Sequence, residues 1–141
     1  MTMREILFRG KAANRKEGRA YRTKYKNGDW VHGMLTDPMN WAGFAEMTNT
    51  SGVQGIEVDR NTVCQYTGMT DKNGNAIYEG DIIKTIHGIR RIVFEDGCFG
   101  AKPNARLFAD LRQYNREVNG EWEVIGNIHD NPELLEVTDH A

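Results

Sequence analysis

The chain of 141 residues is long enough to bury one core and too short for two full-sized domains. Its 39% hydrophobic and 27% charged residues, with only 3 prolines, argue against a disordered or fibrous chain. The net charge of −2 hides an asymmetry, because residues 1–30 carry nine basic and three acidic residues, which gives +6 and leaves −8 for the remainder. We therefore expect one globular domain over residues 1–141 with a strongly uneven charge.

The 15 glycines, the many β-branched and aromatic residues and the scarcity of helix-length apolar stripes indicate strands joined by tight turns. We expect a mainly β fold with at most one or two short helices. The first residues contain an apolar run of only three, far short of a secretion signal or of the roughly 20 residues that span a bilayer. This predicts a cytoplasmic protein without membrane contact, in which Cys64 and Cys98 are free thiols.

The first expected strand covers residues 6–9, and a long basic loop or arm follows at residues 11–27. Asn27 and Gly28 mark a turn, after which residues 29–35 resume an extended pattern. These two strands should pair antiparallel across the arm. Residues 39–55 contain Trp41 and Phe44 among small polar residues and fit no clear pattern, whereas residues 56–58 predict another short strand.

The basic arm has three open interpretations. Its cations could contact the phosphates of a nucleic acid, lie in solvent, or dock on the acidic remainder of the same chain or of a neighbouring subunit. The pI of about 6.1 weighs against the first interpretation, because a nucleic-acid-binding domain is usually basic throughout. The candidate phosphate contacts are Arg15, Lys16, Arg19, Arg22, Lys24 and Lys26.

Residues 65–101 are expected to form antiparallel strands joined by tight turns. Asn73 and Gly74 can both take positive φ, which predicts a hairpin turn. Turn pairs at residues 87–88 and 96–97 predict a β-meander over residues 82–101. The expected core side chains are Ile82, Ile86, Ile92, Phe94, Trp122, Val124 and Ile128.

Two short helices are expected near the end of the chain, on either side of a strand at residues 121–128. Residues 103–115 have apolar side chains at roughly helical spacing, with Pro103 and Asn104 as start signals. Residues 131–133 predict a helical turn in which Asn131 accepts the free amide hydrogens and Pro132 takes the first helical position.

Several strings of the sequence follow one another nearly from end to end: REILFRGK (4–11), DWVHG (29–33), QYTGMTDKNG (65–74), IYEGDIIK (77–84), FEDG (94–97), and EVIGNI (123–128) followed by NPELL (131–135). In their order and spacing they make this chain similar to the YopX family of bacteriophage and prophage proteins. The resemblance implies a phage or prophage origin, an SH3-like β-barrel component and a family without an assigned biochemical role. The long basic arm departs from the family pattern, so the resemblance says nothing about it.

The densest motif surrounds the predicted hairpin, and its carboxylates Asp71, Glu79 and Asp81 have two interpretations. They could act as acid, base or cation ligands, or they could stabilise turns, with Asp71 bonded to its own turn and the tyrosines paired across the hairpin. We favour the structural interpretation, in which the glycines permit special backbone angles. The motif residues are Tyr66, Gly68, Asp71, Gly74, Tyr78, Gly80 and Asp81.

No phosphate-binding glycine loop, nucleophile elbow or zinc-ligand spacing is present, so we expect neither an enzyme nor a cofactor nor a metal. Trp41 and Phe44 lie in an irregular section and are expected to form a contact surface. The favoured hypothesis is a phage or prophage accessory protein that associates with itself, or with a host or phage protein, without catalysis. The alternatives are a nucleic-acid-binding barrel that uses the arm, and an enzyme that uses Asp71 and Asp81 as a carboxylate pair.

Overall fold

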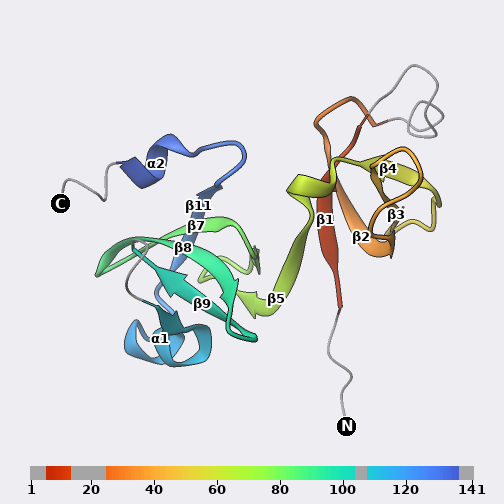
Figure 1. Ribbon diagram of the computed structural model, residues 1–141. Helices are drawn as coiled ribbons and strands as arrows, with labels where there is room; N and C mark the ends of the chain where they lie inside the picture. Colours follow the sequence, from red (N-terminus) through yellow and green to blue (C-terminus); the bar gives the residue numbers. More distant parts are fainter. Residues whose placement is uncertain (1–5, 14–24, 104–107, 137–141) are drawn as a thin grey trace, which may run out of the picture. The chain divides into compact units, whose positions relative to one another are not determined.

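A computed structural model describes residues 6–13, 25–103 and 108–136 (Figure 1). The chain divides into two compact units, residues 1–66 and 67–141, which we describe separately. Each unit has its own cluster of buried side chains. That the two behave as one domain stays a prediction.

The first unit is built from short antiparallel strands. They are β1 (Phe8–Lys11), β2 (Trp30–Asp37), β3 (Ala45–Asn49), β4 (Ile56–Val58), the 3-10 helix η2 (Arg60–Thr62) and the start of β5 (Cys64–Thr70). β1 pairs with β2 from Phe8 opposite Gly33 to Lys11 opposite Trp30, which confirms the antiparallel pair expected on either side of the arm. The arm lies largely outside the described residues, but its first residue, Lys11, belongs to β1.

The core of the first unit forms where the strands approach one another closely. Val31, Met47 and Val58 have no exposed surface. Gly10 lies directly over this core, because a Cβ there would come within 3.0 Å of the Val58 side chain. Gly33 is tighter still, since an added Cβ would overlap the carbonyl oxygen of Thr48 on the neighbouring strand. Close packing between strands therefore requires glycine at position 33 and leaves little room for a side chain at position 10.

The second unit contains the expected meander. Its elements after β5 are β6 (Ala76–Tyr78), β7 (Asp81–Thr85), β8 (Gly88–Glu95), β9 (Cys98–Lys102), β10 (Ala109–Asp110), α1 (Leu111–Glu117), β11 (Glu123–Asn127) and α2 (Glu133–Glu136). The five-stranded sheet has the order β10-β9-β8-β7-β11, and the other sheet has the order β4-β3-β2-β1-β5-β6. The fold is thus mainly β with two short helices. Strand pairing closes no barrel within the described ranges.

The core of the second unit confirms part of the expected set. Ile82, Ile92 and Trp122 are buried, and Val124 and Ile128 are half-buried. Ile86 and Phe94 were wrongly expected in the core, because they are 85% and 49% exposed. Ile86 sits after the last residue of β7, in the turn to β8, where the alternation of faces ends. Phe94 lies near the end of β8 and packs edge-on against Phe99, with ring centroids 5.0 Å apart.

The helices are present, but their starts differ from the expected ones. α1 begins at Leu111, and the Asp110 carboxylate accepts hydrogen bonds from the amides of Arg112 and Gln113. The expected start at Pro103 was wrong because Ala109 and Asp110 pair with β9, and this pairing delays the helix.

At the C-terminal side, α2 confirms the predicted helical turn, although its capping differs from the expectation. Asn131 bonds the amide of Leu134 through its backbone carbonyl, whereas its side chain accepts from the amide of Asn127. None of the helices in the described part is long and apolar enough to cross a membrane.

Candidate functional site

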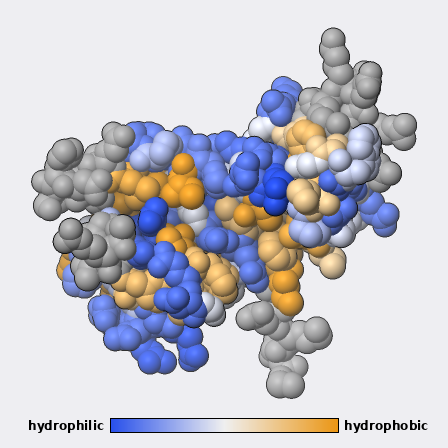
Figure 2. Space-filling model, viewed as in Figure 1, coloured by the Kyte–Doolittle hydropathy of each residue, from blue (hydrophilic) through white to orange (hydrophobic). Residues whose placement is uncertain are grey.

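The loop between β2 and β3 carries the most exposed aromatic side chain of the described chain. Trp41 is 95% exposed, and its neighbour Met39 is 55% exposed. Phe44 is half-buried, so of the two aromatic residues expected to form a contact surface, Trp41 is exposed and Phe44 is partly packed against the protein. Figure 2 shows that apolar residues reach the surface in several places.

The buried side chain of Asn40 holds this loop in one shape. Its Oδ1 accepts hydrogen bonds from the amides of Ala42 and Phe44, both at 3.0 Å. Its Nδ2 donates to Glu46 at 2.9 Å and to Glu57 at 2.8 Å. These four bonds give hydrogen-bond partners to two backbone amides of the loop and to two carboxylates. The Trp41 ring is therefore exposed on a loop whose backbone is held by hydrogen bonds.

Asp71 organises the predicted hairpin turn. Its Oδ1 accepts from the amides of Asn73 at 2.9 Å and Asn75 at 2.8 Å, and its Oδ2 accepts from the amide of Val124 in β11 at 3.0 Å. Burial raises the pKa of the Asp71 carboxyl, but the hydrogen bonds from Val124, Asn75 and Asn73 lower it by more, so the pKa lies below its ordinary value. The expected bond to its own turn is confirmed, and the bond to β11 was not foreseen.

The remaining motif residues also lie in turns and strands. Gly68, Gly74 and Gly80 have φ of 86°, 82° and 86°, which confirms the expected special backbone angles. Asp81 is 1% exposed, and its Oδ2 accepts from the amide of Tyr78 at 2.7 Å, which fixes the turn into β7. Tyr78 itself is buried. Among the described residues no cluster of three or more His, Cys, Asp or Glu side chains could hold a metal ion.

Two cations of β1 lie over an aromatic ring of β2. The guanidinium carbon of Arg9 is 4.7 Å and the Nζ of Lys11 is 5.4 Å from the centroid of a Trp30 ring. His32 lies opposite Arg9; partial burial, and then the Arg9 cation, lower the pKa of His32 below its ordinary value. Sequence reasoning missed this cluster, although the alternation of faces in the β1–β2 register would have placed these side chains together.

The candidate phosphate contacts Arg15, Lys16, Arg19, Arg22 and Lys24 lie outside the described residues. Lys26 is described and exposed. Both cysteines are free thiols, as expected, with Cys64 buried and donating to the carbonyl of Thr62.

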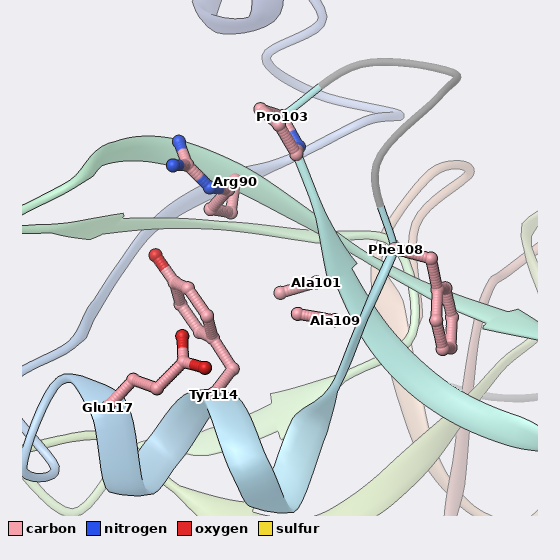
Figure 3. Close-up of a pocket in the computed structure, with 7 residues that line it drawn as sticks. All are labelled: Arg90, Ala101, Pro103, Phe108, Ala109, Tyr114 and Glu117. Carbon is pink, nitrogen blue, oxygen red and sulfur yellow. The ribbon is translucent and has the colours of Figure 1, made fainter.

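The second unit contains a surface pocket of about 270 Å³ that sequence reasoning did not foresee (Figure 3). Figure 3 shows the methyl groups of Ala101 and Ala109 pointing into it, whereas the Phe108 ring points away. That ring covers Gly100, where any Cβ would overlap it. The lining residues are Arg90, Ala101, Pro103, Phe108, Ala109, Tyr114 and Glu117.

A comparison with protein families matches residues 17–136 to the family described as YopX protein, which covers most of the chain. The chain belongs to the YopX family. The match begins after the string at residues 4–11, so that part of the resemblance lies outside it. No curated protein matches the chain.

Among solved structures, this YopX chain is similar to protein EF1440 from Enterococcus faecalis. The two sequences are 25% identical, and the similarity covers 93% of this chain and 98% of EF1440 with a TM-score of 0.49.

Two of the strings that make the chain similar to YopX proteins meet in the second unit. The first, at residues 65–74, contains Asp71, and the second, at residues 123–128, contains Val124, whose amide bonds to Asp71. Beside this bond, the amide of Lys72 donates to the carbonyl of Trp122, and the Trp122 indole donates to the carbonyl of Thr70 at 3.0 Å. These YopX strings, together with Trp122 directly before the second one, therefore form a set of hydrogen bonds between the hairpin turn and β11, which we call the latch.

Proposed function

We propose that this protein is a phage- or prophage-encoded accessory protein of the host cytoplasm that works as a non-catalytic, self-associating interaction module. Family membership and the absence of a catalytic motif from the sequence support this proposal. The observation that carries it is the presentation of Trp41, 95% exposed, from a loop that Asn40 holds in one shape. Exposed aromatic side chains on ordered loops are typical anchors of protein interfaces.

Burial of the Trp41 ring would contribute enough free energy to anchor an interface. A tryptophan buries about 150 to 250 Å² in a complete contact. At about 25 cal/mol per Å² of apolar area this gives roughly 4 to 6 kcal/mol per ring before the cost of association. Because the Asn40 bonds already order the loop, little further ordering opposes the contact. The charge asymmetry of +6 and −8 favours a second copy as the partner, since complementary charge sets encounter and register.

Light scattering coupled to size exclusion at low salt tests this proposal. We expect an oligomer mass for the full chain and a shift toward monomer for Trp41→Ala. Ile86→Ala is the matched control, because it removes another highly exposed apolar side chain, 85% exposed, from the other unit. The double variant Trp41→Ala, Phe44→Ala should weaken assembly more than Lys24→Gln with Lys26→Gln. A monomer mass for the unmodified chain would refute self-association, and the reverse ranking would show that charge holds the subunits together.

A nucleic-acid-binding SH3-like barrel is the second candidate, and the stacking of Arg9 and Lys11 on Trp30 favours it. Lys11 is only half-buried, and the sequence after it carries further basic residues at positions 15–24, so these cations could follow a phosphate backbone. The five-stranded sheet of the second unit, in which β7 lies between β8 and β11, supports the SH3-like description of that unit, whereas Arg9, Lys11 and Trp30 belong to the first unit.

A gel shift with single-stranded and duplex DNA at rising salt separates the two candidates. Phosphate contacts give an affinity that falls steeply with salt, and Lys11→Gln should reduce that dependence. Trp41→Ala should leave DNA binding unchanged. If no shift appears at the lowest salt, this candidate is excluded.

A further inference from the structure

The pocket of the second unit plays no part in the proposed self-association and has a chemistry of its own. Its apolar walls are the methyl groups of Ala101 and Ala109, the ring of Tyr114 and the ring of Pro103 (Figure 3). A volume of about 270 Å³ lies just below the roughly 300 to 1,000 Å³ of pockets for drug-sized ligands, so the space suits a compact apolar group of a few carbon atoms.

A fixed cation stands at the wall of this pocket. The guanidinium carbon of Arg90 is 5.9 Å from the centroid of the Tyr114 ring, and its Nη1 donates to the carbonyl of Ile89 at 3.0 Å. The ring is held in turn, because the Tyr114 hydroxyl lies 2.7 Å from the Thr85 hydroxyl. The other guanidinium nitrogens of Arg90 make no hydrogen bond to the described residues. Arg90 is therefore positioned and retains donors for an anionic group.

A carboxylate completes the lining. Glu117 is exposed at the end of α1, and from the described residues it accepts only a long hydrogen bond, 3.4 Å, from Gln113. No ion pair joins Arg90 to Glu117 in the described part of the chain. The pocket thus offers one positive and one negative group that do not neutralise each other directly, above an apolar floor.

We propose that this pocket binds a free α-amino acid with an aliphatic side chain. The side chain would lie on Ala101, Ala109 and Tyr114, the carboxylate would bond to the Arg90 guanidinium, and the ammonium group would face Glu117. A simple fatty acid would pair its carboxylate with Arg90 but offer nothing to Glu117, and a simple amine would pair with Glu117 but offer nothing to Arg90. A zwitterion is the class of ligand that satisfies both charges.

Titration of the full chain followed by amide NMR tests this assignment, with L-leucine as the probe. We expect saturable shifts for amides of β9, β10 and α1. Three analogues each lack one feature: leucinamide has no carboxylate, 4-methylpentanoate has no ammonium group, and glycine has no apolar side chain. Each should bind about tenfold more weakly or worse, which corresponds to about 1.4 kcal/mol.

Variants separate the contributions of the lining. Arg90→Gln and Glu117→Gln should each weaken leucine binding about tenfold, and Arg112→Gln, an exposed position on the same helix, should leave it unchanged. Ala109→Leu should abolish binding by filling the floor, and the two charge variants keep the test valid if that variant fails to fold. Absence of saturable shifts with leucine, or equal binding of leucine and 4-methylpentanoate, would overturn the proposal.

Discussion

Replacing Asp71 with Asn removes one acceptor atom from the centre of the latch. In the native protein Asp71 is 5% exposed and receives three backbone amides, from Asn73, Asn75 and Val124. If Oδ1 of the asparagine keeps the two turn amides, its NH₂ group faces the Val124 amide, and two donors oppose each other. A hydrogen bond to a charged acceptor contributes about 1.5 to 3 kcal/mol, so we expect the free energy of unfolding of the second unit to fall by about 2 to 3 kcal/mol.

The same substitution should change the pH dependence of stability. Hydrogen bonding lowers the pKa of Asp71 in the folded protein below the ordinary value of 3.8, although burial opposes it. A carboxyl with a lowered folded pKa contributes stability that is fully present above the unfolded pKa and is lost as the pH falls through the folded pKa. The unmodified protein should therefore lose stability below pH 3.8, and Asp71→Asn should lose less over the same window.

Urea unfolding at neutral pH and below pH 3.8 measures both effects, and hydrogen exchange of the Val124 amide reports the latch locally. Asp96→Asn is the matched control, since Asp96 is exposed in the tight turn between β8 and β9 with φ of 52°, which asparagine tolerates. The control should change stability by less than about 0.5 kcal/mol. If Asp71→Asn behaves like the control, the latch does not stabilise the unit.

A single transition reported by probes in both units would support the expectation of one domain.

Three further predictions concern the turns and the close contacts. Gly74→Val should destabilise the second unit by about 1 to 2 kcal/mol, because φ is 82° and no atom lies near an added Cβ, so only backbone strain acts; unchanged urea unfolding would show that the turn adapts. Gly33→Ala should cost the first unit about 3 kcal/mol through overlap with the Thr48 carbonyl, and a melting temperature equal to that of the unmodified chain would contradict this packing. Calcium, magnesium and zinc should leave the melting temperature unchanged; a saturable rise that Asp81→Asn abolishes would show that the carboxylates bind metal.

The meander of the second unit could be predicted from the sequence because short stretches of neighbouring residues determine its turns and strands. Glycine at positive φ marks each tight turn of the meander, and the alternation of faces places Ile82 and Ile92 in the core. Ile86 and Phe94 continue the same apolar alternation, but both side chains are exposed. Nothing in the sequence marks where the buried part of each strand ends. The start of α1 could not be predicted for a related reason, because the pairing of β10 with β9 depends on tertiary structure and not on the local sequence.

The candidate sites depended more on distant contacts. Sequence reasoning identified Trp41 as exposed because its surroundings are glycine-rich and polar, yet it could not foresee that Asn40 joins two carboxylates, one of them 17 residues away. The pocket needed β8, β9, β10 and α1 to be assembled before its lining could be recognised. Asp71 was correctly placed in its own turn, and its bond to Val124 required knowledge of where β11 pairs.

The bond from Val124 to Asp71 spans 53 positions, and this has a consequence for synthesis on the ribosome. The hairpin at residues 71–75 can form as soon as it leaves the exit tunnel, because its own amides satisfy one carboxylate oxygen. The other oxygen finds its backbone partner only after β11, 53 positions further along the chain, has emerged. The nascent second unit therefore stays open to chaperones and proteases until β11 has emerged, and a chain terminated before β11 leaves the Asp71 carboxylate only partly satisfied.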